Sequence, residues 1–211
     1  IGPLADLGYP PHYIMKILVA NEIRKIAHSL RPEVQIYLHW AALGHQVTIF
    51  SPESEYRSQL EAAGITVLCS PQQRKLSWPA ISALRAELAS NDYDVIYATN
   101  SKTIPTAAFA AIGHRAKLVC YRGTTNGLYR SDPTAYLTLQ HPRVDGVVCV
   151  SNAVTEYVKS RLWHDRVVTI YKGHELSWYN ETPADLSDYG IPDDAFVVIA
   201  AAQFRPSKGL S

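Results

Sequence analysis

Short apolar segments alternate with amphipathic segments along most of this chain, and this alternation restricts its fold more than any other feature. The apolar segments are five or six residues long and rich in valine and isoleucine. Strands of this kind are buried on both faces, as in a parallel sheet that is covered by helices. We therefore predict strands at residues 16–20, 45–50, 65–69, 94–99, 117–121, 146–150 and 166–171.

Apolar residues at helical spacing lie between several of these strands. One set follows Pro32 and stops before Gly44, a second occupies residues 56–63, a third follows Pro79 and a fourth follows Ser151. Proline suits a first helical turn, glycine a position just after a helix, and serine an N-cap. Alternating strands and helices with short connections predict an α/β fold, a Rossmann-like doubly wound parallel sheet.

Composition argues against several classes of function. The net charge is +1, so nucleic acid is not an expected partner. The apolar runs are far shorter than the roughly 20 residues that span a bilayer, and residues 1–14 lack the features of a secretion signal, so we expect a cytoplasmic protein. Cys69, Cys120 and Cys149 fall in predicted strands without metal-ligand spacing. We expect buried, reduced thiols and no bound metal.

In an open parallel sheet, ligands bind beyond the carboxyl ends of the strands. The segments at these positions are polar, basic and glycine-containing, and none carries the glycine patterns of dinucleotide-binding proteins or P-loop NTPases. The candidate site residues among them are Asn21, Arg24, Asn100, Lys102, Arg122, Gly123, Thr124, Thr125 and Lys172. Asn100 also suits the cap of a following helix, residues 122–127 suit a simple turn, and Lys172 suits a hinge as well as a ligand.

Five segments follow one another in a characteristic order: "LGHQVTIFSP" (43–52), "DVIYATNS" (94–101), "VVCVSNAV" (147–154), "VVTIYKGHELSWY" (167–179) and "RPSKG" (205–209). Together they resemble the amino-terminal domain of a family-4-type GT-B glycosyltransferase, over residues 15–211. Residues 1–14 contain three prolines and no periodicity, which is typical of a tag or extension. The resemblance implies an acceptor-side domain at 15–173, a connector at 174–194 and the start of an incomplete donor-binding domain at 195–211. A chain of this extent is expected to be inactive alone.

The resemblance also implies roles for individual residues. Arg205 and Lys208 match a loop that meets the donor diphosphate, although a solvated turn is the simpler interpretation of the residues themselves. Arg122 stands where the family often has a histidine near the reacting sugar, and Thr124 offers a hydroxyl beside it. The glycine-rich loop that usually follows the first strand is replaced by a segment that contains Arg24.

The expected function is therefore transfer of a sugar from a nucleotide-diphosphate donor to a hydroxyl acceptor, by a retaining and metal-independent enzyme without a cofactor. A glycan or glycolipid is the expected acceptor, and a glycolipid would bring the protein to the inner face of the membrane. The alternatives are a non-catalytic Rossmann-like binding module and a nucleotide-sugar epimerase of GT-B shape. Only Glu53 and Glu175 suggest themselves as acid and base for an epimerase.

The apolar segment at residues 195–204 predicts one more strand. An unpaired apolar strand is a template for aggregation. We therefore expect this segment to pair with an edge of the first sheet, or with a second copy of the chain in a homodimer.

Overall fold

The computed structural model describes residues 13–23, 31–71, 76–125, 127–129, 132–162, 164–180, 182, 184–192 and 194–199. Three predicted site residues, Arg24, Arg205 and Lys208, lie outside these ranges. The chain divides into two units, Ile1–Gly173 and His174–Ser211, which are described separately.

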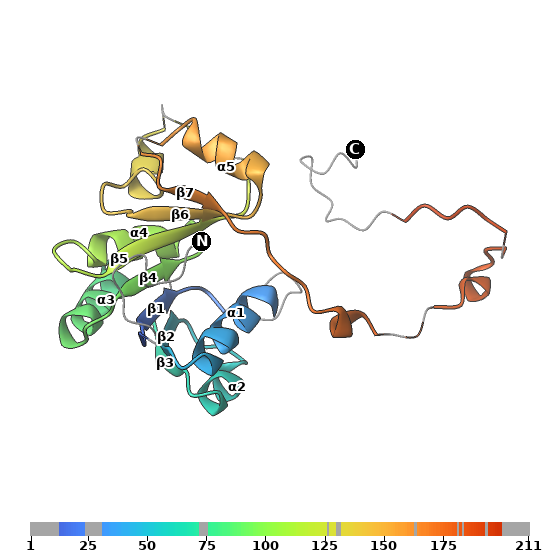
Figure 1. Ribbon diagram of the computed structural model, residues 1–211, viewed down its shortest axis with the longest axis horizontal. Coiled ribbons are helices and arrows are strands. Elements are labelled where there is room, and N and C mark those ends of the chain that lie inside the picture. The colour runs from blue at the N-terminus through green and yellow to red at the C-terminus, as the bar shows by residue number, and fades with distance from the viewer. Residues whose placement is uncertain are drawn as a thin grey trace. The chain divides into compact units, whose positions relative to one another are not determined.

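The first unit contains a sheet of seven parallel strands in the order β3-β2-β1-β4-β5-β6-β7 (Figure 1). The strands are β1 (Lys16–Ala20), β2 (Gln46–Ser51), β3 (Thr66–Cys69), β4 (Val95–Ala98), β5 (Lys117–Arg122), β6 (Gly146–Cys149) and β7 (Val167–Thr169). Each overlaps the segment predicted from the sequence, and the doubly wound α/β fold is confirmed. The chain winds outward from β1 to β3 and then returns to β4 on the other side of β1. The crevice between β1 and β4 is where such sheets bind ligands.

Five helices accompany the sheet in the part of the chain that the structure describes: α1 (Arg31–Ala42), α2 (Arg57–Ala62), α3 (Trp78–Ser90), α4 (Thr103–Ala110) and α5 (Asn152–Lys159). Four of them correspond to predicted helices. Ser151 caps α5 as predicted, because its side chain accepts a hydrogen bond from the Val154 N–H. The sequence did not predict α4, in which all residues except Phe109 are buried, so that it has no polar face and no amphipathic pattern.

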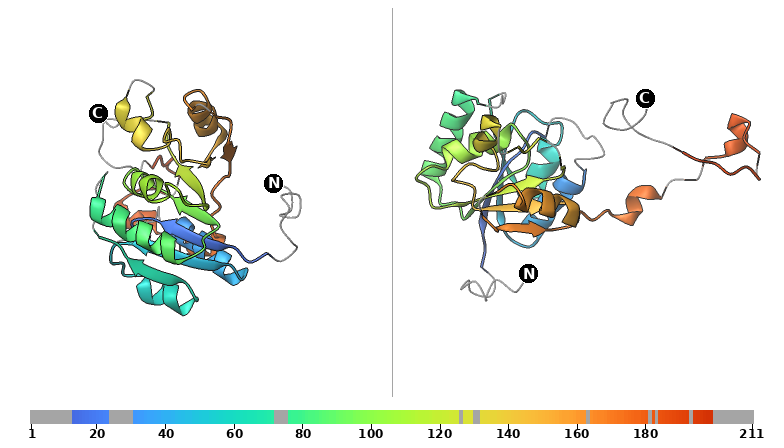
Figure 2. Two further views of the ribbon diagram at one scale, coloured as in Figure 1. Left: turned by 90° about the vertical axis from the view of Figure 1, so that its left-hand side faces the viewer. Right: turned by 90° about the horizontal axis from the view of Figure 1, so that it is seen from above.

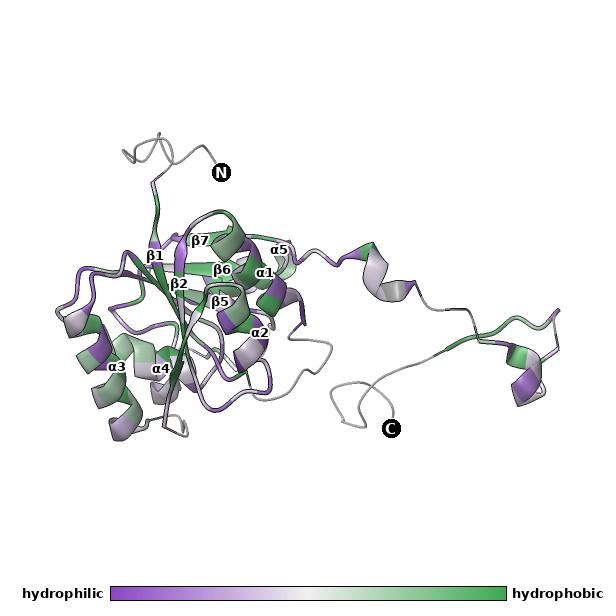
Figure 3. Cartoon of the chain, turned by 90° about the horizontal axis from the view of Figure 1, so that it is seen from below, coloured by the Kyte–Doolittle hydropathy of each residue, from purple (hydrophilic) through white to green (hydrophobic). Residues whose placement is uncertain are grey.

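The helices form layers on the two faces of the sheet, as Figures 1 and 2 show. On one face, α1 and α2 cover β1, β2 and β3, with Val34, Tyr37 and Leu60 packed against the strands. On the other face, α3, α4 and α5 share a single core with β4, β5 and β6. Hydrophobic residues concentrate along the central strands, as the colouring of Figure 3 shows. This double cover explains why the strands are nearly continuous apolar runs.

Arg143 ties α4 to the amino-terminal edge of the sheet. Its guanidinium donates to the carbonyl oxygens of Ala111, at 2.9 Å, and His114, at 2.9 Å, and to that of Ala116. It also forms an ion pair with Asp145, which accepts a hydrogen bond of 2.9 Å from the Leu118 N–H. A single arginine thus donates to three carbonyl oxygens of the connection between α4 and β5.

Two expectations differ from the structure. All three cysteines are free, but Cys69 is exposed rather than buried, because it ends β3 at an edge of the sheet.

The strand expected at residues 195–204 is not formed over 195–199, the part of it that the structure describes. Phe196 is 94% exposed and Ile199 is 79% exposed. A strand is stable only when neighbouring backbone groups bond to it, and these residues pair with no strand.

The second unit contains two short 3-10 helices in its described residues, Leu176–Tyr179 and Leu186–Tyr189. The second ends at Gly190, whose φ of 70° lies in the left-handed region that favours glycine. Across both units, no helix among the described residues has the length and apolar character needed to cross a membrane.

Candidate functional site

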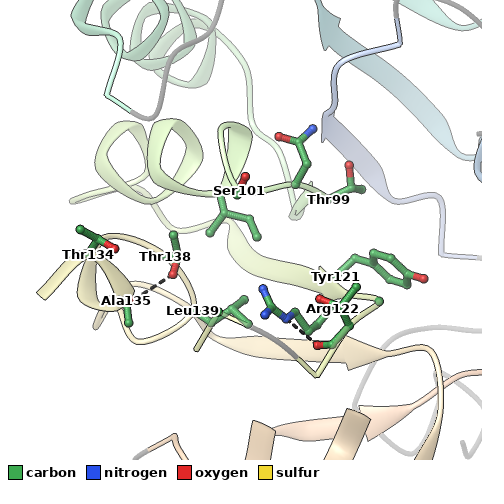
Figure 4. Close-up of a pocket in the computed structure, with 13 residues that line it drawn as sticks. Thr99, Ser101, Tyr121, Arg122, Thr134, Ala135, Thr138 and Leu139 are labelled. Atoms are coloured by element: carbon green, nitrogen blue, oxygen red, sulfur yellow. Dashed lines mark hydrogen bonds between the residues drawn. The ribbon is translucent and has the colours of Figure 1, made fainter. Parts of the chain in front are cut away.

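A pocket of about 410 Å³ opens at the carboxyl ends of β4 and β5 (Figure 4). One wall follows β4, a second is formed by the end of β5 and the loop after it, and a third is the 3-10 helix Pro133–Leu137 with the residues after it. The lining residues are Thr99, Asn100, Ser101, Ile104, Tyr121, Arg122, Gly123, Thr124, Gly127, Thr134, Ala135, Thr138 and Leu139. Hydroxyl groups and one guanidinium thus supply most of its polar surface, which suits an anionic or polyhydroxylated ligand.

Arg122 is the cation in this lining. It is the last residue of β5, and its Nε donates to the Thr124 carbonyl oxygen at 2.9 Å, so the loop that follows the strand holds the guanidinium (Figure 4). Gly127 lies beside it with a φ of 77°, a conformation that side chains other than glycine rarely adopt. Burial lowers the pKa of Arg122 from its ordinary value. The guanidinium keeps its charge at neutral pH, because arginine is not deprotonated in proteins.

The loop that carries Gly127 is anchored to the core. The Leu128 side chain is buried, and the Tyr157 hydroxyl of α5 both accepts from the Leu128 N–H, at 3.1 Å, and donates to its carbonyl oxygen, at 3.2 Å. Arg161 stacks on the Tyr157 ring with its Cζ 3.8 Å from the ring centroid. The segment after β5 is therefore held at both ends rather than forming a simple solvated turn.

Asn100 lies both at the pocket and at the start of α4. It lines the pocket, and its Oδ1 accepts from the backbone N–H groups of Lys102 and Thr103, each at 3.0 Å, where the chain enters α4. The side chain thereby occupies N–H groups that a free helix N-terminus would offer to an anion. Its Nδ2 donates to Asn21 Oδ1 at 3.4 Å, which links the ends of β4 and β1.

Asn21 belongs to a buried polar cluster beside the pocket. It is 2% exposed, and its Nδ2 donates to Glu33 Oε2, at 3.1 Å, and to the Tyr37 hydroxyl, at 3.0 Å. Lys172 Nζ donates to the other oxygen of Glu33, Oε1, at 2.6 Å, and lies 4.6 Å from the centroid of the Tyr121 ring. Burial, followed by the negative charge of Glu33, raises the pKa of Tyr37, so its hydroxyl stays protonated.

Lys102 forms a second ion pair at this edge of the sheet. Its Nζ lies 3.1 Å from Glu22 Oε2, and the lysine side chain is about half exposed. Near the crevice, Lys102 thus pairs with Glu22, which follows β1, and Lys172 pairs with Glu33, which lies in α1.

The structure brings most of the predicted residues to one edge of the sheet. Asn100, Arg122, Gly123 and Thr124 line the pocket, and Asn21 and Lys172 reach it through neighbours. Thr125 is exposed on the same loop but is not among the lining residues. The catalytic or binding role of each remains a prediction.

Sequence reasoning missed Glu33, Tyr121 and the two threonines of the third wall, Thr134 and Thr138. Glu33 stands in the first turn of α1, where an acidic residue ordinarily favours the helix dipole in solvent. Tyr121 lies within a predicted strand, and the third wall lies in a segment for which no element was predicted. The "DPT" at residues 132–134 offered one signal, because Asp followed by Pro suits the start of a short helix.

Among the described residues, no group of three or more His, Cys, Asp or Glu side chains is arranged to hold a metal ion. Asp92 and Asp94 are spaced as D-x-D but lie at the amino-terminal end of β4, opposite the pocket. There Asp94 accepts from the Tyr13 hydroxyl and the Lys16 N–H, each at 2.8 Å, and Asp92 pairs with Arg115. These carboxylates hold the edge of the sheet together.

The comparison with family models identifies one family. The model of glycosyltransferase family 4 matches residues 34–178, which include α1 from Val34 onward, the lining residues of the pocket and β7. The chain belongs to glycosyltransferase family 4. The resemblance stated from the sequence is therefore confirmed, and the pocket lies within the matched residues. Comparison with curated protein sequences gives no match.

Solved structures of GT-B glycosyltransferases share the fold of the family 4 chain. Anabaena Alr3699/HepE in complex with UDP and glucose superposes with a TM-score of 0.61 and 20% identity, over 83% of this chain and 49% of that one. A glycosyltransferase from Rickettsia africae ESF-5 superposes with a TM-score of 0.64 and 17% identity, over 86% of this chain and 51% of that one. The chain thus spans about half the length of these structures.

An epimerase shares the fold as well. A UDP-N-acetylglucosamine 2-epimerase from Listeria monocytogenes, described as putative, superposes with a TM-score of 0.51 and 14% identity, over 74% of this chain and 44% of that one. Fold similarity alone therefore does not separate transfer from epimerisation. Of the two residues suggested for an epimerase, Glu53 is exposed on the loop after β2 and is not among the lining residues of the pocket. Glu175 belongs to the second unit, which is described separately.

Proposed function

We propose that this chain is the acceptor-side part of a retaining glycosyltransferase that moves a sugar from a nucleotide-diphosphate donor to the hydroxyl group of a glycan or glycolipid. Family membership supports the reaction class. The observation that carries the assignment to this site is the pocket at the ends of β4 and β5, in which Arg122 stands among hydroxyl side chains.

In this reaction, the bond between the anomeric carbon and the donor diphosphate breaks, and the acceptor oxygen forms a new bond to that carbon. The nucleoside diphosphate departs with an additional negative charge, and one of its phosphate oxygens takes up the proton that the acceptor hydroxyl loses. We propose that the Arg122 guanidinium stabilises this charge, without a metal or cofactor, because a fixed cation in a partly dry site stabilises charge that develops in the transition state. Thr124 and Asn100 would orient hydroxyl groups of the bound sugars.

Arg205 and Lys208 are proposed to bind the same diphosphate, on the strength of the family resemblance alone. Each would contribute a charge-assisted contact to the phosphate oxygens. Association with the inner face of the membrane is proposed only for the case in which the acceptor is a glycolipid.

Replacement of Arg122 tests the proposal. In the full-length enzyme, Arg122→Ala should lower kcat by roughly 10²–10³, the usual cost of removing one group that stabilises transition-state charge. Arg122→Lys should recover part of the rate, because the charge is kept while the two-nitrogen geometry is lost. The control is Arg57→Ala, which removes an exposed pair with Glu61 on α2 and should leave kcat unchanged.

Transfer rates measured by release of nucleoside diphosphate decide the outcome. If Arg122→Ala and Arg57→Ala give the same kcat, Arg122 does not act on the leaving group and the proposed mechanism is wrong.

A further inference from the structure

Glu33 lies at the centre of the buried polar cluster, although it does not line the pocket. It is 8% exposed, and each of its carboxylate oxygens accepts from a different part of the sheet. Oε2 accepts from Asn21, which follows β1, and Oε1 accepts from Lys172, which follows β7. The strands β4, β5 and β6 lie between β1 and β7, so the chain that leaves β7 must return along the carboxyl edge to reach this carboxylate.

Each of the two partners of Glu33 contacts a residue that lines the pocket. Through Asn21, Glu33 connects to Asn100, which lines the pocket and holds the two N–H groups where α4 begins. Through Lys172, it connects to Tyr121, which lines the pocket at the end of β5 and lies beneath the ammonium group. The walls that follow β4 and β5 are therefore joined through one carboxylate.

A buried ion pair is weak evidence of stabilisation, because the attraction between the charges roughly offsets the cost of removing both from water. Its clear effect is on geometry. Neither charged group can leave its partner without being buried alone, and removal of one partner is costly for that reason. The pair thus restricts the position of Asn21, of Lys172 and of the segment at residues 170–173.

We propose that Glu33 is a positioning residue of the pocket. Its carboxylate fixes the start of α4 through Asn21 and Asn100, and fixes the segment that leaves β7 through Lys172. The consequence for catalysis rests on the proposed function, because a glycosyl transfer needs both sugars held within a fraction of an ångström of the reactive arrangement. The structural part of the proposal does not depend on the reaction.

Hydrogen exchange of backbone amides in the full chain tests the structural part. In Glu33→Gln, the Lys102 and Thr103 amides at the start of α4 and the Ile170 amide after β7 should exchange at least about tenfold faster, because charge-assisted contacts behind them are lost. The Leu118 amide, which Asp145 holds at the opposite edge of the sheet, should change less than about twofold. Lys172→Arg, which keeps a cation for Glu33, should resemble the wild type, whereas Lys172→Met should speed exchange at Ile170.

Three results would overturn the proposal: unchanged exchange at both segments, an increase confined to α1, or an equal increase throughout the sheet. If Glu33→Gln does not fold, the comparison of Lys172→Met with Lys172→Arg is judged by the same criteria at Ile170.

Kinetics in the full-length enzyme test the catalytic part. Glu33→Gln should lower kcat by about tenfold or more while KM changes less than about threefold, because the sugars still bind but are held less accurately. Lys172→Arg should retain most of kcat. Equal kcat in Glu33→Gln and wild type overturns the catalytic consequence, whereas a wild-type protein that transfers no sugar counts against the proposed function and leaves the exchange result valid.

Discussion

Replacement of Arg143 should weaken the fold more than replacement of any neighbouring cation. Arg143→Met removes hydrogen bonds to the carbonyl oxygens that follow α4 and leaves Asp145 without its most buried cation. The Arg143 side chain is only 17% exposed. Breaking a buried pair costs about 3–5 kcal/mol, so we expect a loss of about 3 kcal/mol, a large share of a typical stability of about 5–15 kcal/mol.

Arg166→Met is the matched control, because Arg166 pairs with the same carboxylate. Its Nη1 lies 4.0 Å from Asp145 Oδ1, and its side chain is 58% exposed. Surface pairs of this kind contribute about 0–1 kcal/mol. Urea unfolding followed by far-ultraviolet circular dichroism measures both variants. A difference between them of less than about 1 kcal/mol would refute the argument that burial decides the contribution.

The same pair should make the stability of the fold depend on pH. Partial burial alone would raise the pKa of Asp145, but the Leu118 N–H and the Arg143 charge outweigh it and hold the pKa below its ordinary value. A carboxyl group of this kind contributes stability above its unfolded pKa, and the contribution is lost as the pH falls through the folded pKa. The difference in unfolding free energy between wild type and Arg143→Met should therefore shrink below about pH 4.

Two further substitutions and one control test local features. Ser151→Ala removes the side-chain cap of α5 and should cost about 1 kcal/mol in thermal unfolding; an unchanged Tm would mean that solvent replaces the cap. Gly127→Ala forces a side chain into a left-handed conformation and should cost about 1–2 kcal/mol, with reduced donor affinity as Arg122 shifts. Gly173→Ala, where the backbone is not left-handed and the space is open, should be nearly neutral.

The sheet could be predicted from the sequence because each strand either is covered on both faces or lies next to a strand that is covered on both faces. Burial on both sides removes polar residues from the strand, so the apolar runs mark the strands directly. Burial also explains why α4 was not predicted. A helix that is buried on nearly every side has no polar face, so its sequence shows no helical period. The segment at 195–199 has the composition of a strand, but composition does not supply a neighbouring strand.

The edge of the sheet at which the candidate residues gather was predictable, whereas the partners of the charged residues were not. The edge at which Asn100 and Arg122 meet follows from the parallel topology alone. The pairing of Glu33 with Lys172 joins residues 139 positions apart, and it depends on the path of the chain after β7. Nothing in the sequence near Glu33 distinguishes it from an ordinary acidic residue in the first turn of a helix.

The most direct test of the account is a proton NMR time course of the full-length protein with a nucleotide-diphosphate sugar, with and without an acceptor glycan. The account predicts that the donor is stable alone, and that adding acceptor releases nucleoside diphosphate and produces the anomeric signal of a new glycosidic bond with the configuration of the donor. Conversion of the donor to its epimer in the absence of any acceptor would contradict the account and assign the fold to an epimerase instead.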